Sequence, residues 1–123
     1  MDIQPFLGPP ATLLQWLESC VANPGQQYWL LFKDPHGNTE VTLATEMYPI
    51  LGDDDFSPEE FDEFEESIHP CGYSNFLNLD QLEDIICNLA MQKENYSRAE
   101  LLYAVNYYFS HDAFVVVSKG IVS

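Results

Sequence analysis

The sequence predicts an α+β fold, in which about four helices pack on a small, mainly antiparallel sheet of three or four strands. Two observations support this prediction. Apolar residues recur at helical spacing in four segments, and most of these segments begin with a residue that caps helices. Between the helices, short runs of bulky apolar residues are typical of strands. With 123 residues, the chain is expected to form a single domain over residues 1–123 whose core needs no disulfide or metal.

The first part of the chain predicts a helix followed by two strands. Residues 1–10 are expected to form an irregular arm that packs on the core through Ile3, Phe6 and Leu7. A helix is expected from Thr12 to a stop at Asn23-Pro24-Gly25, with an inward face of Leu13, Leu14, Leu17 and Val21. Residues 27–33 and 39–47 then predict two antiparallel strands on either side of a turn.

The stretch from Asp53 to Glu66 is the most acidic part of the chain, because nine of its fourteen residues are carboxylates and none is basic. Within it, Ser57 and Glu60 form the pattern of a capping box, and Pro58 suits the first helical position because no backbone donor is needed there. A helix is therefore expected from about Pro58 to Ile68, with a narrow apolar stripe at Phe61, Phe64 and Ile68. A helix that served stability alone would be expected to interleave lysines, and this one has none.

Two further helices are expected in the second half of the chain. Asn78 predicts the start of a helix that runs to about Met91, with an inward face of Leu82, Ile85, Ile86 and Leu89. Ser97 and Glu100 form another capping box, which predicts a helix that continues to about Phe109.

Two extended segments are expected to complete the sheet. Residues 73–77 are predicted to form a short extended piece between the acidic helix and the next one. The β-branched run at residues 113–117 predicts a third strand, central in the sheet or packed on the two earlier strands.

The chain carries a strong negative charge, with twenty acidic residues against four bases and a formal net charge of −16. The bases are Lys33, Lys93, Arg98 and Lys119. Nucleic acid and anionic membrane surfaces would repel such a chain, so neither is expected as a partner. A basic protein would be attracted, and the attraction would weaken as the salt concentration rises.

The sequence gives no indication of export or of membrane insertion. The opening residues, MDIQPFLGPP, lack the basic and apolar regions of a leader, and no run approaches the ~20 apolar residues of a membrane span. The three cysteines show no paired spacing, and two of them, Cys20 and Cys87, are expected as small buried residues of helices. The protein is therefore expected in the cytoplasm.

No catalytic or metal-binding motif can be assembled from the residues. Phosphate-binding glycine loops and the nucleophile elbow are absent, and no paired Cys or His spacing completes a metal site. His69 and Cys71 are close enough in sequence to suggest a catalytic pair, but a break between two secondary-structure elements also explains them. No enzyme activity, metal or cofactor is therefore expected.

In its size, its acidity and its acidic helix flanked by aromatic residues, the chain resembles the small bacterial immunity proteins that neutralise nuclease toxins, of the contact-dependent growth inhibition or colicin type. The resemblance implies a one-to-one complex with a cognate toxin, which would be basic because it must hold nucleic acid. Carboxylates would accelerate the encounter, and aromatic side chains would slow dissociation.

The residues expected to bind this partner are the carboxylates and a phenylalanine of the acidic stretch, together with two tyrosines at helical spacing. They are Asp53, Asp54, Asp55, Phe56, Glu59, Glu60, Asp62, Glu63, Glu66, Tyr103 and Tyr107. The sequence favours core packing for the two tyrosines over partner binding, and exposure of either one would favour the interface role instead.

Three other interpretations stay open. An adaptor with an incidentally acidic surface would have the same charge but no salt-sensitive partner. A DNA-mimic inhibitor of a nucleic-acid enzyme would spread its carboxylates in two rows at phosphate-like spacing, whereas here they are concentrated in one segment. A hydrolase would require His69, Cys71 or a pair of carboxylates to converge in a pocket.

Overall fold

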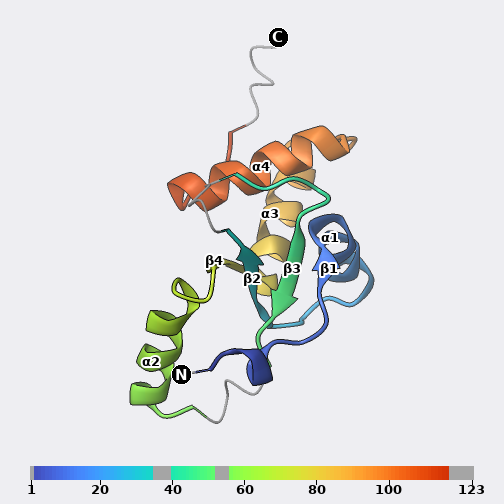
Figure 1. Cartoon of the computed structure of the whole chain (residues 1–123). Coiled ribbons are helices and arrows are strands. Elements are labelled where there is room, and N and C mark those ends of the chain that lie inside the picture. Colours follow the sequence, from blue (N-terminus) through green and yellow to red (C-terminus); the bar gives the residue numbers. More distant parts are fainter. Residues whose placement is uncertain (1, 35–39, 52–55, 117–123) are drawn as a thin grey trace.

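The computed structural model describes residues 2–34, 40–51 and 56–116 and confirms the predicted α+β class (Figure 1). Its strands are β1 (Ala11–Thr12), β2 (Trp29–Lys33), β3 (Glu46–Pro49) and β4 (Tyr73–Asn78). They form one antiparallel sheet in the order β1-β3-β2-β4. The predicted antiparallel pairing of the first two long strands is confirmed in β2 and β3, where Leu31 lies opposite Tyr48. The extended piece expected at residues 73–77 is strand β4, which pairs with the other edge of β2.

Four α-helices and a short 3-10 helix, η1 (Gln4–Phe6), accompany the sheet in the described part of the chain. The α-helices are α1 (Leu13–Ala22), α2 (Pro58–Ile68), α3 (Leu79–Gln92) and α4 (Arg98–His111). Each begins with a reciprocal capping box, whose N-cap residues are Thr12, Ser57, Asn78 and Ser97. The local sequence therefore fixes where all four helices start. The inward face expected for α3 is also confirmed, since Leu82, Ile85, Ile86 and Leu89 are buried.

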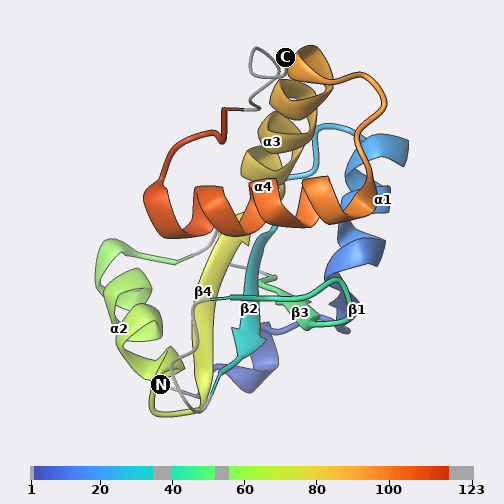
Figure 2. The same cartoon turned by 90° about the horizontal axis from the view of Figure 1, so that it is seen from above.

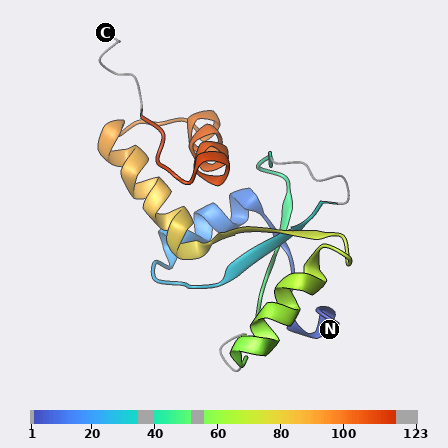
Figure 3. The ribbon, with the colours of Figure 1, turned by 90° about the vertical axis from the view of Figure 1, so that its left-hand side faces the viewer.

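The sheet separates two apolar clusters, because successive residues of a strand point to opposite faces. Leu30 and Phe32 of β2 pack with α1, α3 and α4. Leu31, between them, packs with Phe64 and Ile68 of α2. Figures 2 and 3 show this arrangement, with α2 and the N-terminal arm on one side of the sheet and the other three helices on the opposite side. Helix α2 is therefore the only α-helix of the described chain on its face of the sheet.

The N-terminal arm packs as predicted beside α2. Ile3 is fully buried in the α2 cluster, and Phe6 and Leu7 lie partly buried against it. The N–H of Gly8 donates to the carbonyl oxygen of Pro49 at 2.8 Å. A Cβ atom on Gly8 would lie 2.8 Å from the ring of Pro49, so this close approach of arm and strand requires glycine.

The prediction of a strand at residues 113–117 is wrong for the residues that the structure describes. Residues 113–116 follow α4 without pairing to the sheet, and Val117 lies outside the described residues. The segment is held instead by α3 and α4. Gln92 donates to the carbonyl oxygen of Val115 at 2.9 Å, and the ring of Phe114 lies 5.3 Å from that of Tyr108. A β-branched run predicts an extended backbone, but it does not decide whether a sheet edge is available.

Two further boundaries differ from the sequence predictions. Residue 39 of the strand expected at residues 39–47 lies outside the described residues, and the described part forms a strand only from Glu46, because Thr42 and Thr45 close a turn before it. Val21, expected on the inward face of α1, is 66% exposed. Helix α1 buries Leu13 and Leu17 as expected, and it buries Cys20 in place of Val21.

Candidate functional site

Helix α2 presents its carboxylates to solvent. The six acids of the helix are all exposed, and they are Glu59, Glu60, Asp62, Glu63, Glu65 and Glu66. On the opposite side, Phe64 and Ile68 are buried and anchor the helix on the sheet. None of the six acids forms an ion pair with a residue that the structure describes. The helix is therefore held by a narrow apolar stripe and leaves its negative charge uncompensated within the described chain.

The six carboxylates differ in their surroundings. Glu60 serves the fold, because its carboxylate accepts from the N–H of Ser57 at 3.1 Å while the Ser57 hydroxyl accepts from the N–H of Glu60 at 3.2 Å. With 3.6 residues per turn, the side of the helix that faces away from Phe64 carries Glu59, Asp62, Glu63 and Glu66. We call these four residues the outer carboxylates. Glu65 differs from them, since it lies at the edge of the helix next to the sheet, on the side of Phe61.

Of the described basic residues, Lys93 and Lys33 contact other side chains, and Arg98 lies at the start of α4. Lys93 pairs with Glu100, with 2.7 Å between Nζ and Oε2, and Arg98 is the first residue of α4. Both bases lie at the connection between α3 and α4, which Figures 1 and 2 show at the opposite corner of the molecule from α2. The ammonium group of Lys33 lies 5.7 Å from the ring centre of Tyr48, and Tyr48 raises the pKa of Lys33. Lys93 and Arg98 are therefore far from the acidic helix, whereas Lys33 lies on the α2 face of the sheet, where it contacts Tyr48.

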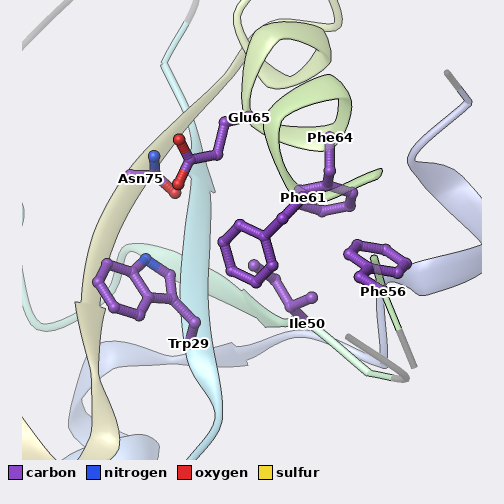
Figure 4. Close-up of a pocket in the computed structure, with 7 residues that line it drawn as sticks. All are labelled: Trp29, Ile50, Phe56, Phe61, Phe64, Glu65 and Asn75. Carbon is purple, nitrogen blue, oxygen red and sulfur yellow. The ribbon is translucent and has the colours of Figure 1, made fainter. Parts of the chain in front are cut away.

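A small apolar hollow of about 50 Å³ lies between α2 and the sheet (Figure 4). It is lined by Trp29, Ile50, Phe56, Phe61, Phe64, Glu65 and Asn75. Its aromatic walls come from β2, from α2 and from the residue before the α2 cap, while Glu65 and Asn75 supply its polar groups. Pockets for drug-sized ligands measure roughly 300–1,000 Å³, so this hollow suits the end of a single side chain rather than a whole metabolite.

Two aromatic side chains at the hollow are exposed. Phe61 is 43% exposed and Trp29 is 36% exposed, and Figure 4 shows the ring of Phe61 pointing from α2 toward Trp29. The prediction that Phe61 belongs to the stripe that docks on the core is wrong. Phe64 and Ile68 already fill the contact with the sheet, so Phe61, one turn earlier, extends beyond it. Exposed aromatic residues beside charged ones are typical of protein interfaces.

Phe56 has a packing role beside the hollow. It is half-buried, and the centre of its ring lies 4.9 Å from that of Phe6, 5.6 Å from that of Phe64 and 6.1 Å from that of Phe61. Ring centroids at 4.5–7 Å are typical of favourable aromatic pairs. Phe56 therefore ties the chain before α2 to the N-terminal arm, and its contact with a partner stays a prediction.

The two tyrosines of the predicted partner surface lie on α4, away from α2. Tyr103 is 63% exposed and Tyr107 is half-buried, with 6.3 Å between their ring centres. The ring of Tyr107 stacks on that of His111 at 4.1 Å, and this row borders a groove of about 360 Å³. Because α4 packs on the other face of the sheet, the structure does not bring the tyrosines to the acidic helix. The predicted partner residues therefore divide between two surfaces.

The residues of the hydrolase alternative do not converge in a pocket. His69 and Cys71 are both exposed in the turn between α2 and β4, and neither lines the hollow. Cys20 is buried as expected, and burial raises the pKa of its thiol to about 11, which makes it a poor nucleophile. Cys87 is exposed on α3, so the prediction that it is buried is wrong.

The described residues contain neither a cluster suited to a metal ion nor a helix suited to a membrane. No group of three or more His, Cys, Asp or Glu residues among them is arranged to hold a metal ion. No helix in the same part of the chain has the length and apolar character needed to cross a membrane.

The sequence analysis and the structure define overlapping but different sites. Asp53, Asp54 and Asp55 lie outside the described residues. The lining residues that the sequence analysis did not select as partner contacts are Trp29, Ile50, Phe61, Phe64, Glu65 and Asn75. A signal existed for Trp29, because alternate residues of a strand share a face and Trp29 therefore lies on the side of Leu31. No local spacing connects Ile50 or Asn75 with α2, since they come from separate segments of the chain.

Comparison with known proteins gave one match. The profile of a family described as Domain of unknown function (DUF7716) matches residues 14–117. The matched range contains the whole of α2 and every residue that lines the hollow. Comparisons with curated proteins and with solved structures gave no match.

Proposed function

We propose that this chain, which belongs to the DUF7716 family, is an immunity protein that binds and neutralises a basic, nuclease-type toxin through helix α2. One observation carries the proposal. Six exposed carboxylates without an ion pair in the described chain lie beside a hollow with two exposed aromatic side chains. The complex would be one-to-one and would form in the cytoplasm. Neutralisation by binding requires no catalysis, metal or cofactor from this chain.

The carboxylates and the exposed aromatic side chains of this surface would act on different steps of binding, namely association and dissociation. Exposed ion pairs contribute only ~0–1 kcal/mol each, so the outer carboxylates would mainly accelerate the encounter with a basic partner. Aromatic side chains that lose water on binding are typical hot spots, and they slow dissociation. Phe61 and Trp29 are the side chains available for this second role.

The shape of the charged surface favours a protein contact over mimicry of DNA. Helix α2 has 11 residues, which corresponds to roughly 16 Å of helix. B-DNA instead presents two rows of phosphates, with one charge per ~1.7 Å of its axis. A solvated face of an adaptor would account for the carboxylates, but it would give no reason for Phe61 and Trp29 to remain exposed among them.

The test is co-expression with the protein encoded by the gene next to that of this chain. That neighbour is expected to be basic, to be toxic when expressed alone, and to lose both toxicity and nuclease activity when one equivalent of this chain is present. A variant with the four outer carboxylates changed to Lys is expected to be folded by circular dichroism and to give no protection.

The matched control changes four other exposed acids to Lys, namely Glu18, Glu40, Asp84 and Glu94, and alters the net charge equally. It is expected to protect as well as the natural chain at ~0.15 M salt, because charges away from the interface are screened over about 8 Å. Full protection by the outer-carboxylate variant would exclude α2 from the interface. Absence of any neutralisation by the natural chain would overturn the immunity function itself.

A further inference from the structure

We propose that the hollow beside α2 binds the guanidinium group of an arginine side chain from a basic segment of the partner. The inference rests on the proposed function, because it assigns a residue type to the basic protein that α2 would contact. It concerns the hollow lined by Trp29, Phe61, Glu65 and their neighbours, which is distinct from the outer carboxylates on the far side of the helix.

The size of the hollow limits what can enter it. Its volume is about 50 Å³, compared with about 150 Å³ for a cavity that holds benzene. The hollow is therefore too small to enclose a large aromatic ring or a nucleotide base. The planar end of one side chain is of the right size.

The lining of the hollow favours a cation. Trp29 and Phe61 are aromatic, and their ring faces attract a positive group within about 6 Å of the ring centre. Among the residues that the structure describes, Glu65 is the only charged one in the lining, so this part of the hollow combines aromatic walls with one negative charge. The side-chain amide of Asn75 adds a carbonyl oxygen that can accept a hydrogen bond. An anion would meet the Glu65 carboxylate and would be repelled.

Arginine fits this lining better than lysine. A guanidinium is flat, stacks on aromatic rings and presents paired N–H groups that match a carboxylate such as that of Glu65. An ammonium is compact and strongly hydrated, so its removal from water costs more hydration free energy. The chain already places a cation near an aromatic ring at its surface, where Lys33 lies 5.7 Å from the ring centre of Tyr48.

Charge complementarity identifies the occupant as part of a basic protein segment. From the rim of the hollow, the outer carboxylates continue around and along α2. None of them has an ion pair in the described chain. A segment that inserts an arginine into the hollow and continues around α2 would therefore bring further Lys or Arg residues to the outer carboxylates.

The experiment uses the intact chain and three short peptides, so it does not depend on a toxin. The peptides are N-acetyl-Gly-Arg-Gly-Arg-Gly amide and its lysine and citrulline counterparts, so that the side chains alone carry charge. Binding is followed by two-dimensional NMR through the indole N–H of Trp29 and the side-chain amide of Asn75. The arginine peptide is expected to shift both signals and to bind at least about fivefold more tightly than the lysine peptide, while the neutral citrulline peptide is expected to shift neither.

Two isosteric variants make the test specific to the hollow. Glu65→Gln and Glu18→Gln each remove one exposed carboxylate from a helix, but only Glu65 lines the hollow, and Glu18 lies on α1, which packs on the other face of the sheet. Glu65→Gln is expected to weaken binding of the arginine peptide at least about fivefold, and Glu18→Gln by less than about twofold. Equal effects of the two variants, equal binding of the arginine and lysine peptides, or unchanged Trp29 and Asn75 signals would overturn the proposal.

The outcome is separable from that of the proposed function. If Glu65→Gln and Phe61→Ala leave neutralisation of the toxin unchanged while the outer-carboxylate variant abolishes it, α2 is the interface and the arginine site is wrong. If no toxin is neutralised, the peptide titration still reports whether the hollow takes a guanidinium group.

Discussion

The ring of Phe56 packs edge-on against that of Phe6, with 4.9 Å between the ring centres and 82° between the planes. This contact joins the N-terminal arm to the residue that precedes the cap of α2. The acidic helix is therefore held at its start by an aromatic contact and along its length by Phe64 and Ile68.

Replacing Phe56 with Ala should destabilise the fold as well as alter the hollow. The half-buried ring would be lost together with its contacts to three other phenylalanines, at a cost of about 1.5–3 kcal/mol in the free energy of unfolding. Urea unfolding measures this cost. The comparison variant is Phe61→Ala, whose ring is 43% exposed and whose loss should cost under about 1 kcal/mol. Equal costs for the two variants would show that Phe56 does not anchor the arm.

Changing Glu66 to Lys should stabilise the chain while weakening partner binding. Asp62 and Glu66 are four residues apart on one face of α2, where like charges repel by roughly 0.2–0.5 kcal/mol. The substitution would replace this repulsion with attraction and would place a cation near the helix C-terminus, with a total gain of about 0.5–1.5 kcal/mol. Chemical unfolding should show the gain. A loss of stability would mean that the carboxylate has a structural role, contrary to our view that its acidity serves binding.

Removal of the Asn106 side chain should loosen the segment before β3. Its Oδ1 accepts from the N–H of Val41 at 2.9 Å, and its Nδ2 donates to the carbonyl oxygen of Val41 at 2.9 Å. Asn106→Ala would leave both backbone groups of a buried residue unpaired, which should cost about 1–3 kcal/mol. Asn95→Ala, at an exposed turn, should change stability by less than about 0.5 kcal/mol. The Tm values of both variants show whether the two hydrogen bonds of Asn106 stabilise the fold more than an exposed side chain does.

The ion pair between Lys93 and Glu100 should make a small contribution to stability that disappears in acid. The hydrogen bond from Lys93, followed by that from the backbone of Ser97, lowers the pKa of Glu100. Since the folded pKa lies below the unfolded one, the contribution is present above the unfolded pKa and is lost as the pH falls through the folded pKa.

The corresponding measurement compares Tm for the natural chain and Glu100→Gln between pH 7 and about pH 3. Gln keeps the capping box with Ser97, so the variant removes the charge alone. The natural chain should have the higher Tm at pH 7, and the two should converge in acid. A difference that persists at the lowest pH would mean that Gln fails to cap α4 and that the pair is not responsible.

Local signals predicted the helices of this fold well. A capping box is a local pattern that shows where a helix begins. Ser57, Asn78 and Ser97 are each the N-cap residue of a helix. Strands were less predictable, because a strand forms only where another strand pairs with it, and the local sequence does not identify that neighbouring strand. The run at residues 113–116 has the composition of a strand but packs on α3 and α4, whereas β4, with the mixed sequence YSNFLN, pairs with β2.

The candidate site was predictable only in its charged part. The carboxylates of α2 are visible in the sequence because they are consecutive or nearly so, and the structure places all six on the surface. The hollow depends on four segments brought together by the sheet, with Trp29 from β2, Ile50 directly after β3, Asn75 from β4 and Phe61 from α2. Tyr103 is separated from α2 because its own helix, α4, packs on the opposite face of the sheet, and the local sequence does not show which face a helix covers.

The central claim, that α2 and its hollow form the partner interface, is tested most directly by hydrogen–deuterium exchange of this chain with and without the basic protein encoded by the neighbouring gene. Our account predicts slower exchange in peptides that cover α2 and the start of β2, with α4 unchanged. Slower exchange confined to the Tyr103–His111 face of α4, with α2 unchanged, would contradict the account and would move the interface to the other side of the sheet.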